Sequence, residues 1–432
     1  MKKLLVINHN NTIFTDNTQQ LQDGSIFVVS KQNQKFEKIA LENKTVKTIQ
    51  SSQLKDYFDF SSIKVIGVTG TNGKTTTTAA IYSFLLDLGY KVALQGTRGF
   101  FINDTKVEDY TLTTPVQLSN FAHIQKAIDE GCEFFVMEVS SHAIEQNRIE
   151  GIDFALKVHT NITSDHLDYH KSLENYIKIK NSFFADDSMK LINKDDNKIK
   201  FKMKNVYAYG MENPATYKVT AYSLKDGIHV ALQNFSNMVS FSSPMLGLFN
   251  IYNLTAAIAS VNLLTKKPLQ EICDVVEYFA GVAGRVEVLH NDPLIIVDFA
   301  HTPDGIEKLL NNFADYDIIT VFGAGGNRDR TKRPLMGKVA QYFSKEIIIT
   351  SDNPRFEDPE LITQDILKGI DKGSNVTVEL NRKEAIALAI KKASNYKKPA
   401  IFILGKGDEE YQIIYDKKFP LKDKDIVLSL LS

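Results

Sequence analysis

The stretch Ile63-Lys-Val-Ile-Gly-Val-Thr-Gly-Thr-Asn-Gly-Lys-Thr-Thr76 decides how the rest of this chain is organised. Its first part, residues 63–68, is largely apolar and β-branched, which predicts a buried strand. A glycine-rich turn follows, and residues 77–86 then carry the apolar spacing of a helix. This strand, turn and helix are the context in which a phosphate-binding loop is expected.

The turn has the residues that a nucleotide phosphate requires. Gly70 and Gly73 allow backbone N–H groups to close around phosphate oxygens at the positive end of the helix dipole. We expect Lys74 to reach the β- and γ-phosphates of ATP, and the Thr75 hydroxyl to bind Mg²⁺. Val68 stands where the common pattern has its first glycine. The alternative is a strand-to-helix turn that binds no nucleotide.

Length and composition narrow the class of protein. A chain of 432 residues is too long for a single hydrophobic core and predicts two to three domains. A formal net charge of −1 argues against general nucleic-acid binding, which needs a basic excess. Two cysteines exclude a disulfide framework and favour a reducing compartment. Because no apolar run is long enough to cross a membrane, we expect a cytoplasmic enzyme.

The order of elements predicts an α/β protein. Short apolar runs at Leu4–Ile7 and Ile26–Val29 predict a small first domain of strands and turns. From Ile63 onward, expected strands alternate with helices: the strands cover residues 89–95, 133–137 and 154–158, and a helix covers residues 117–130. Such alternation implies a mostly parallel sheet, with ligands bound at the carboxyl ends of its strands.

Glu138 directly follows one of these apolar strands. An acid at that point of a phosphate-loop protein is placed to hold the nucleotide's Mg²⁺, directly or through water. The alternative is a strand-end glutamate that faces solvent.

His166 and His170 are four residues apart, with Asp165 and Asp168 among them. This pattern is compatible with a transition-metal site, but it lacks the third ligand spacing that zinc sites have. A structural role for the two histidines is the alternative.

Lys180 lies on the apolar stripe of the helix that Ser172 is expected to cap, at the spacing 173/177/180/184. The lysine either extends its ammonium outward to solvent or is buried with a lowered pKa. In the second case its amine is available to CO₂, and the carbamate would hold a second Mg²⁺.

A second α/β pattern runs from about residue 288 to the end, after a polar stretch, 190–245, in which we recognise no chemistry. Its expected strands end in polar, glycine-rich or acidic residues: 294–298, 318–322, 346–350 and 400–404. Four such strand ends in one domain would line a single crevice. Arginines beside exposed glycine backbone suit carboxylate binding, because guanidinium forks match carboxylates.

Five motifs occur in an order that resembles the Mur ligases of peptidoglycan synthesis, and among them those that add diaminopimelate as the third amino acid. They are Gly70-Thr-Asn-Gly-Lys-Thr75, Glu138-Val-Ser-Ser-His142, Thr160-Asn161 with Asp165-His-Leu-Asp-Tyr-His170, Asp352-Asn-Pro-Arg355 and Gly405-Lys-Gly-Asp-Glu409. The resemblance implies three domains: a small N-terminal α/β domain for the UDP end (1–60), a central ATP-binding parallel-sheet domain (61–286) and a C-terminal Rossmann-like domain for the amino acid (287–432).

The resemblance also implies the site residues. Catalytic roles fall on Lys74, His166 and Lys180. ATP contacts fall on Gly70, Thr71, Asn72, Gly73, Lys74, Thr75, Thr76, Asn250, Asn253, Arg285 and Asp298. Metal contacts fall on Thr75, Glu138, His166 and Lys180 as its carbamate. Contacts to the UDP-muramoyl dipeptide fall on Thr113, Thr114, Ser140, Gln146 and Arg148. Contacts to diaminopimelate fall on Arg328, Asp352, Asn353, Pro354, Arg355, Gly405 and Glu409.

Arg355 carries the expected choice of amino acid. In the family, arginine in this motif goes with diaminopimelate, whose far carboxylate lysine lacks; Arg355 would pair with that carboxylate and Glu409 with the nearby ammonium. Two departures from the family pattern are Asp408, where histidine is usual, and Asp16-Asn-Thr18, where Asp-Ser-Arg is usual.

The expected activity is ATP- and Mg²⁺-dependent formation of an amide bond between UDP-N-acetylmuramoyl-L-alanyl-D-glutamate and meso-diaminopimelate, through an acyl phosphate. We expect a monomer that binds neither nucleic acid nor membrane. The alternatives are a lysine-adding Mur ligase, a ligase like folylpolyglutamate synthase, and a nucleotide-dependent switch or scaffold that ligates nothing.

Overall fold

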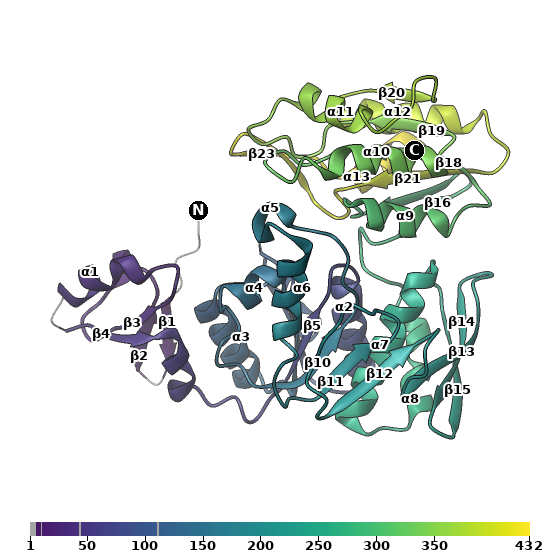
Figure 1. The fold of residues 1–432 in the computed structure, drawn as a ribbon. Coiled ribbons are helices and arrows are strands. Elements are labelled where there is room, and N and C mark those ends of the chain that lie inside the picture. The colour runs from purple at the N-terminus through teal and green to yellow at the C-terminus, as the bar shows by residue number, and fades with distance from the viewer. Residues whose placement is uncertain (1–5, 10, 43–44, 110–111) are drawn as a thin grey trace.

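The computed structural model describes residues 6–9, 11–42, 45–109 and 112–432. In this part of the chain the strands form three large sheets and a separate hairpin. Figure 1 shows three units, with the N-terminal unit beside the central one and the C-terminal unit above it. The expected α/β class with several parallel-sheet units is confirmed.

The N-terminal unit is a four-stranded sheet with the order β1-β2-β3-β4. Its strands are β1 (Val6–His9), β2 (Thr12–Thr15), β3 (Ile26–Val29) and β4 (Lys47–Gln50). Short helices connect them: η1 (Thr18–Gln20), η2 (Gln34–Phe36), α1 (Glu37–Glu42) and η3 (Ser51–Tyr57). The expected strand at Ile26–Val29 is confirmed, whereas Leu4 and Leu5 of the first apolar run lie outside the described residues.

The N-terminal unit is joined to the central unit by an aromatic contact. Phe58, at the end of η3, packs edge-on against Phe121 with ring centroids 5.4 Å apart. Phe14 of β2 and Phe58 belong to the same apolar core as Phe121. The first unit is therefore held against the side of the central sheet that α3 (Gln117–Asp129) covers.

The central unit is an eleven-stranded sheet with the order β15-β14-β13-β12-β11-β10-β5-β9-β6-β7-β8. The strands are β5 (Lys64–Thr69), β6 (Val92–Gly96), β7 (Gly99–Ile102), β8 (Thr105–Glu108), β9 (Phe134–Glu138), β10 (Phe154–His159), β11 (Lys190–Asn193), β12 (Val206–Gly210), β13 (Tyr217–Ser223), β14 (Ile228–Asn234) and β15 (Asn237–Ser243). The strands from β6 to β13 in this order are parallel, and antiparallel strands close both ends.

Helices cover both faces of this sheet, because alternate side chains of the central strand β5 are apolar in both directions. Ile66 and Val68 belong to the core under α2 (Lys74–Asp87) and α7 (Leu248–Thr265), whereas Val65 belongs to the core under α3. The remaining helices are α4 (Ser141–Glu145), α5 (Leu167–His170), α6 (Leu173–Ser182), α8 (Leu269–Asp274) and η4 (Val276–Tyr278).

Helix α7 is, among the described residues, the one helix long and apolar enough to cross a membrane by length and composition. Here 67% of it is buried inside the protein, where it packs against α2 in the central core.

The C-terminal unit is a six-stranded sheet with the order β16-β17-β21-β18-β19-β20, parallel except for β16. Its strands are β16 (Glu287–Asn291), β17 (Leu294–Asp298), β18 (Asp317–Phe322), β19 (Glu346–Ile349), β20 (Val376–Val378) and β21 (Pro399–Leu404), and β22 (Tyr411–Ile414) and β23 (Lys417–Pro420) form the hairpin. One face is covered by α9 (Pro303–Asn311), α10 (Lys332–Phe343) and α11 (Pro359–Leu367), and the other by α12 (Arg382–Ala393) and α13 (Asp423–Leu431). All four strands expected in this region are present.

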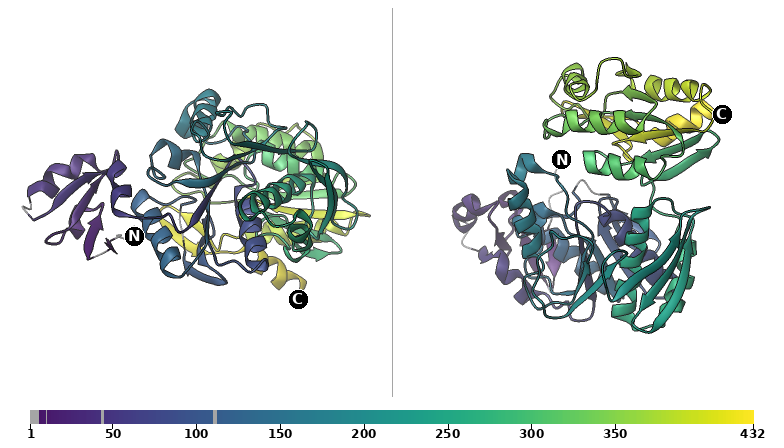
Figure 2. Two further views of the ribbon diagram at one scale, coloured as in Figure 1. Left: turned by 90° about the horizontal axis from the view of Figure 1, so that it is seen from below. Right: turned by 45° about the vertical axis from the view of Figure 1, so that its right-hand side comes forward.

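The C-terminal unit lies over the edge of the central sheet at which the parallel strands end, as two further views show (Figure 2). Two hydrogen bonds join the units in that region. Asn72 of the phosphate loop donates to Asp304 of α9 at 3.0 Å, and Asn312 at the end of α9 accepts from the backbone of Leu248 at 2.7 Å. The strand ends of both sheets therefore face the same space.

Candidate active site

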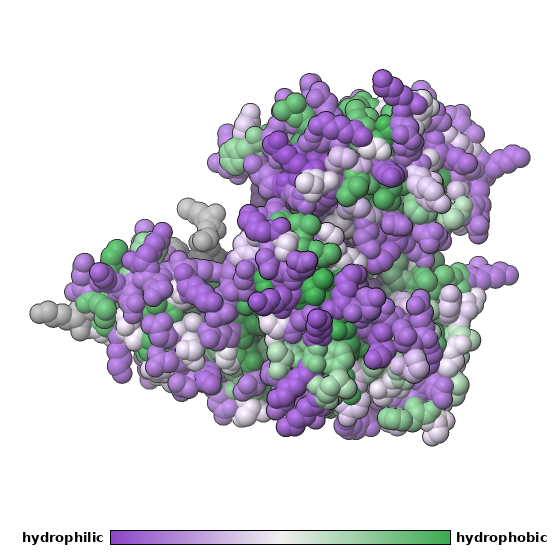
Figure 3. Space-filling model, in the orientation of Figure 1, coloured by the Kyte–Doolittle hydropathy of each residue, from purple (hydrophilic) through white to green (hydrophobic). Residues whose placement is uncertain are grey.

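A cavity of about 1250 Å³ separates the central and C-terminal units. It corresponds to the notch below the upper unit in the space-filling view, where most of the rim is hydrophilic (Figure 3). Its lining includes most of the residues predicted to bind ATP and diaminopimelate: Thr71, Asn72, Gly73, Lys74, Thr75, Thr76, Asn250, Asn253, Arg285, Asp298, Arg328, Asp352, Asn353, Arg355, Gly405 and Glu409. Segments far apart in the sequence thus meet in one cleft.

The phosphate loop is held in shape by the neighbouring strand end. Asn161 accepts from the backbone N–H of Thr71 with its carbonyl oxygen (2.7 Å) and from that of Asn72 with its side chain (3.0 Å). Gly70 has to be glycine, because a Cβ there would lie 1.8 Å from Thr160 Oγ1. Lys74 donates to the carbonyls of Gly70 and Thr71, at 2.8 and 2.9 Å. The ammonium is therefore folded over the loop in which phosphates would bind.

Two oxygen ligands suited to Mg²⁺ meet beside this loop. Thr75 Oγ1 donates to Glu138 Oε2 at 3.0 Å, and the backbone N–H of Thr97 donates to Oε1 at 2.8 Å. Glu138 is the last residue of β9 and is buried, not directed to solvent. Gly96 makes room for the carboxylate, because a Cβ there would lie 2.3 Å from Oε1. A buried carboxylate beside a hydroxyl fits Mg²⁺, which prefers oxygen ligands.

Lys180 is buried under the phosphate loop. Its side chain is 1% exposed, and Nζ donates to the carbonyl of Gly70 at 2.9 Å. Burial, together with the charge of Lys74, moves the pKa of Lys180 well below its ordinary value. Of the two sequence-based alternatives, the structure therefore has the buried amine and not the outward-pointing one. Ser172 caps α6 as expected, but Phe184 lies beyond the last residue of that helix.

His166 lies on the other side of the loop, next to Asp165, with Nε2 3.4 Å from the carboxylate. Its ring meets that of His142 edge-on at 5.0 Å. Burial lowers the pKa of His166 to about 4. In residues 6–9, 11–42, 45–109 and 112–432, no three His, Cys, Asp or Glu side chains gather as a metal-binding group. His166 thus lines the cleft without joining Glu138 in such a group.

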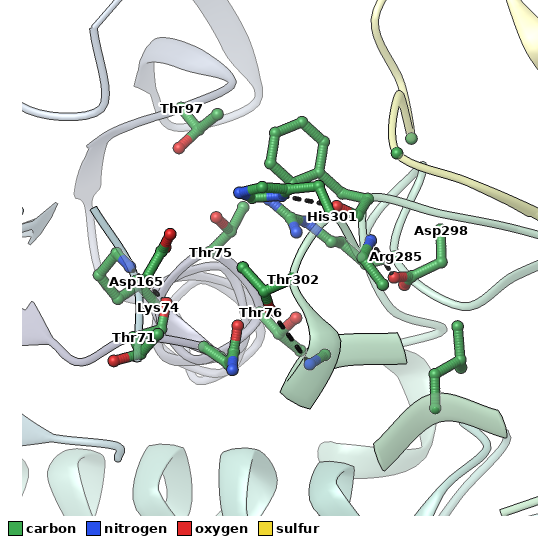
Figure 4. A pocket seen from close by; sticks show the side chains of 18 of the residues that line it. Thr71, Lys74, Thr75, Thr76, Thr97, Asp165, Arg285, Asp298, His301 and Thr302 are labelled. Carbon is green, nitrogen blue, oxygen red and sulfur yellow. Dashed lines mark hydrogen bonds between the residues drawn. The ribbon is translucent and has the colours of Figure 1, made fainter. Parts of the chain in front are cut away.

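The C-terminal unit presents its own polar groups to the phosphate loop, as the close view shows (Figure 4). His301 of this unit, together with Arg285 of the segment that leads into it, faces Lys74 and Asp165 across the cleft. Burial alone raises the pKa of Asp165, but the charges of His166, His301 and Lys332 outweigh it and hold that pKa at about 2. Asp165 is therefore ionised among basic groups from both units.

The asparagines and Asp298 also reach this region. Asn253 donates to Asn250 at 2.9 Å and accepts from Thr77 of α2 at 3.3 Å, so α7 is tied to the start of the nucleotide helix. Asp298 accepts from the backbone of Val286 and Ala300, at 2.8 and 2.6 Å. These side chains connect the phosphate loop with the segment that leads into the C-terminal unit.

Four of the five residues predicted to hold the muramoyl dipeptide, Thr114, Ser140, Gln146 and Arg148, form one hydrogen-bond network. Thr114 accepts from the backbone of Ser140 at 3.0 Å, and Arg148 donates to the carbonyl of Thr114 at 2.8 Å. Arg148 also donates to Gln146 at 2.6 Å, which accepts a further bond from Gln32 at 2.7 Å. Gln32 belongs to the N-terminal unit, so this network continues into the unit predicted to take the UDP end. Thr113 lines the main cleft and accepts from Thr97 at 3.3 Å.

Two arginines come together where the amino acid is expected. The backbone of Gly325 lies against both: a Cβ there would lie 3.0 Å from Arg355 Nη1 and 3.6 Å from Arg328 Cγ. Burial, and then the charge of Arg328, lowers the pKa of Arg355. Arg355 is half-buried, not fully buried, and adopts φ of +53°. Two like charges beside exposed backbone form a place for a carboxylate.

The acidic side of this site is built by the strand ends of β19 and β21. Glu409 accepts from Asn353 at 2.8 Å and from Lys406 at 2.9 Å. Gly405 lies against Asp352, because a Cβ on Gly405 would lie 2.6 Å from Oδ2 of Asp352. Pro354 lines a smaller cavity of about 820 Å³ behind the motif.

Several residues of the cleft were not predicted. Lys406 is completely buried, although a lysine between two glycines suggests an exposed turn. Asp195 and Asp196 line the cleft from the polar stretch in which the sequence revealed no chemistry. Asn161 is part of the Thr160-Asn161 motif, but no role was predicted for it. Its position just after a predicted strand, 154–158, could have indicated that it lies beside the phosphate loop.

The phosphate loop, the buried acid beside it and the arginines that face it across the cleft fit an ATP-dependent ligase. The chain belongs to the Mur ligase family. Residues 68–261 match the Mur ligase middle domain, and residues 284–407 match the Mur ligase glutamate ligase domain.

Named relatives agree with this family. The UDP-N-acetylmuramoyl-L-alanyl-D-glutamate–2,6-diaminopimelate ligase of Wolinella succinogenes is 51% identical, over 96% of this chain and 95% of its own. The Helicobacter pylori enzyme of the same name is 45% identical, over 99% and 97%. A solved structure with that name has a TM-score of 0.68 at 30% identity, covering 97% of this chain and 94% of the other. A Mycobacterium tuberculosis folylpolyglutamate synthase, with a TM-score of 0.66 at 16% identity over 80% and 89% of the two chains, shares the fold.

Proposed function

We propose that this chain joins the D-glutamyl carboxylate of UDP-N-acetylmuramoyl-L-alanyl-D-glutamate to an amine of meso-diaminopimelate, with conversion of ATP to ADP and phosphate. The relatives in Wolinella succinogenes and Helicobacter pylori carry the name of this activity. The observation that carries the proposal is the pairing of Arg328 and Arg355 beside Gly325, in the same cleft as the phosphate loop. An amino acid with a second carboxylate fits two adjacent arginines better than lysine does.

The reaction proceeds in two displacements. A carboxylate oxygen of the substrate attacks the γ-phosphorus of ATP, the bond to the bridging oxygen breaks, and ADP leaves. The deprotonated amine then attacks the acyl carbon of the resulting acyl phosphate, the bond to the phosphate oxygen breaks, and phosphate leaves. Closure of the cleft must exclude water during this sequence, because an acyl phosphate otherwise hydrolyses.

The phosphate loop binds ATP in this proposal. The backbone of residues 70–73 and the N-terminus of α2 hold the phosphates, and Lys74 moves from the loop carbonyls to the transferred group. Thr75 and Glu138 would hold Mg²⁺, with His166 and the carbamate of Lys180 as further candidates. When bound, Mg²⁺ supplies positive charge against the phosphate oxygens.

The three units divide the substrates among them. Residues 1–60 take the UDP end, residues 61–286 take ATP and the dipeptide, and residues 287–432 take the amino acid. Thr114, Ser140, Gln146 and Arg148 orient the dipeptide through their shared network, together with Thr113. We place the enzyme, as a monomer, in the cytoplasm, where peptidoglycan precursors are made.

Phosphate release with ATP, Mg²⁺ and the UDP-muramoyl dipeptide tests the proposal when meso-diaminopimelate and L-lysine are compared. Release stimulated by diaminopimelate alone, with an amide product by mass spectrometry, is the expected result. Stimulation by lysine would retain the ligase and overturn the assignment of Arg355. Indifference to both amines, with addition of glutamate to folate instead, would favour an activity like folylpolyglutamate synthase.

A further inference from the structure

An ion pair crosses the cleft at a point that the assignments above do not use. Arg98 lies in the turn between β6 and β7 of the central unit, and its Nε is 3.5 Å from Oδ2 of Asp408. Asp408 follows β21 of the C-terminal unit. The two side chains are 36% and 33% exposed, so each is partly shielded from water. The pair therefore joins two units that are separated by the cleft.

Asp408 belongs to a segment that is fixed at its other side by the amino-acid site. Glu409 comes directly after it and is held by Lys406 and Asn353, at 2.9 and 2.8 Å. The segment also packs against the connection between the units, because a Cβ on Gly284 would lie 2.1 Å from the backbone nitrogen of Asp408. Asp408 is therefore linked both to the amino-acid site and to the connection between the two units.

Charged side chains flank the pair on both sides. Lys106 is on β8, the strand that pairs with β7 beside Arg98, and Glu410 lies two residues after Asp408. The pKa of Glu410 is lowered first by its hydrogen bond with Lys422 and also by the charge of Lys106, with Asp109 acting in the opposite direction. Lys106 is itself paired with Asp109, and Glu410 with Lys422, so Arg98 and Asp408 form the direct ion pair between these two segments.

We propose that Arg98 and Asp408 form a latch that holds the amino-acid site closed over the phosphate loop, and that Arg98 is a positioning residue for the incoming amine. The inference rests on the proposed function in one respect, that the segment 405–409 binds the amino acid. With the latch open, the amine site and the acyl phosphate are less often within reach of each other. An ion pair of this exposure shifts a closure equilibrium about two- to five-fold.

Charge exchange tests the latch. The single variants R98D and D408R place like charges together, and the double variant R98D/D408R restores an opposite pair. Small-angle scattering of the ligand-free protein is expected to give a larger radius of gyration for both single variants than for the wild type, and the wild-type value for the double variant. High salt is expected to reduce the difference, since it screens the pair.

Kinetics supply the second measurement. Each single variant is expected to raise KM for the amino acid about two- to five-fold, with a smaller change in KM for ATP, and the double variant to recover. Exchange of Lys202 and Asp187 is the control, because that pair is 2.7 Å apart, lies away from the cleft and is only somewhat more exposed, at 53% and 46%. It is expected to change neither measurement.

Scattering that is the same for the single variants and the wild type would overturn the latch, as would single and double variants that are equally impaired. The scattering needs no substrate. A wild-type protein that adds no diaminopimelate would therefore defeat the proposed function and leave the latch to be decided by scattering alone.

Discussion

Lys406 Nζ lies 2.9 Å from Oε2 of Glu409, and Asn353 donates to the same oxygen at 2.8 Å. Lys406 is completely buried and also donates to the carbonyl of Tyr411 at 2.6 Å and to Asn353 Oδ1 at 3.3 Å. The lysine is thus enclosed by three acceptors and fixes the carboxylate that we assign to the ammonium of the amino acid.

Lys406→Met is expected to raise KM for diaminopimelate about ten- to hundred-fold, because a buried partner is lost and Glu409 is no longer oriented. The KM for ATP is expected to change little. Steady-state kinetics with each substrate varied in turn will measure both. Lys417→Met, on the exposed hairpin, is the control. Equal losses for both substrates would instead indicate a general folding defect.

Arg355→Ala is expected to lower kcat/KM for diaminopimelate about ten- to hundred-fold and to leave any activity with L-lysine nearly unchanged. The reason is that the lost guanidinium recognises a carboxylate that lysine does not have. Competition assays with both amino acids give the ratio directly. Arg330→Ala removes a nearby exposed arginine, 67% exposed and paired with Glu357, and is expected to keep the ratio. A parallel loss for both amino acids would contradict the assigned role.

Glu138→Gln is expected to raise the Mg²⁺ concentration for half-maximal activity about ten- to hundred-fold, because it removes a charged ligand beside Thr75. Titration of phosphate release with Mg²⁺ at saturating substrates will measure this. Glu133→Gln is the matched control: Glu133 is exposed and directly precedes the same strand, β9. An unchanged Mg²⁺ dependence in the Glu138 variant would remove this residue from the metal site.

In protein freed of CO₂, the buried amine of Lys180 is expected to make the free energy of unfolding increase with pH. Its pKa is lowered in the folded state, chiefly by burial, so between that value and the ordinary 10.5 the unfolded chain binds the additional proton. The free energy of unfolding therefore increases as the pH rises through this window. Lys180→Met removes this increase, whereas Lys178→Met, on the exposed side of the same helix, retains it. Urea denaturation at a series of pH values measures the slope, and equal slopes in all three proteins would refute the prediction.

The same buried amine predicts a requirement for CO₂. Removal of bicarbonate is expected to reduce ligation by the wild type, and its return to restore activity. Mass spectrometry under non-denaturing conditions should detect the added CO₂ on the wild type and not on Lys180→Met. Full activity without CO₂ would mean that Lys180 acts as a free amine.

The sequence by itself determined the elements and the phosphate loop. β5, the following turn and α2 lie where the apolar run, the glycines and the helical spacing predicted them, because these signals are local. The strand ends of the C-terminal sheet were predictable for the same reason, and parallel topology then brought them to one edge. The resemblance to known motifs predicted which substrate each of the three units takes.

The tertiary structure decided those features that depend on packing between segments far apart in the sequence. Lys180 was open to either an exposed or a buried position, and only its place under Gly70 settled which, since burial depends on what covers a side chain. The same holds for Lys406, enclosed between two strand ends, and for the pairing of Arg98 with Asp408 across the cleft. The residues of such contacts are scattered along the chain, and no local spacing relates them. Their meeting is a property of the fold.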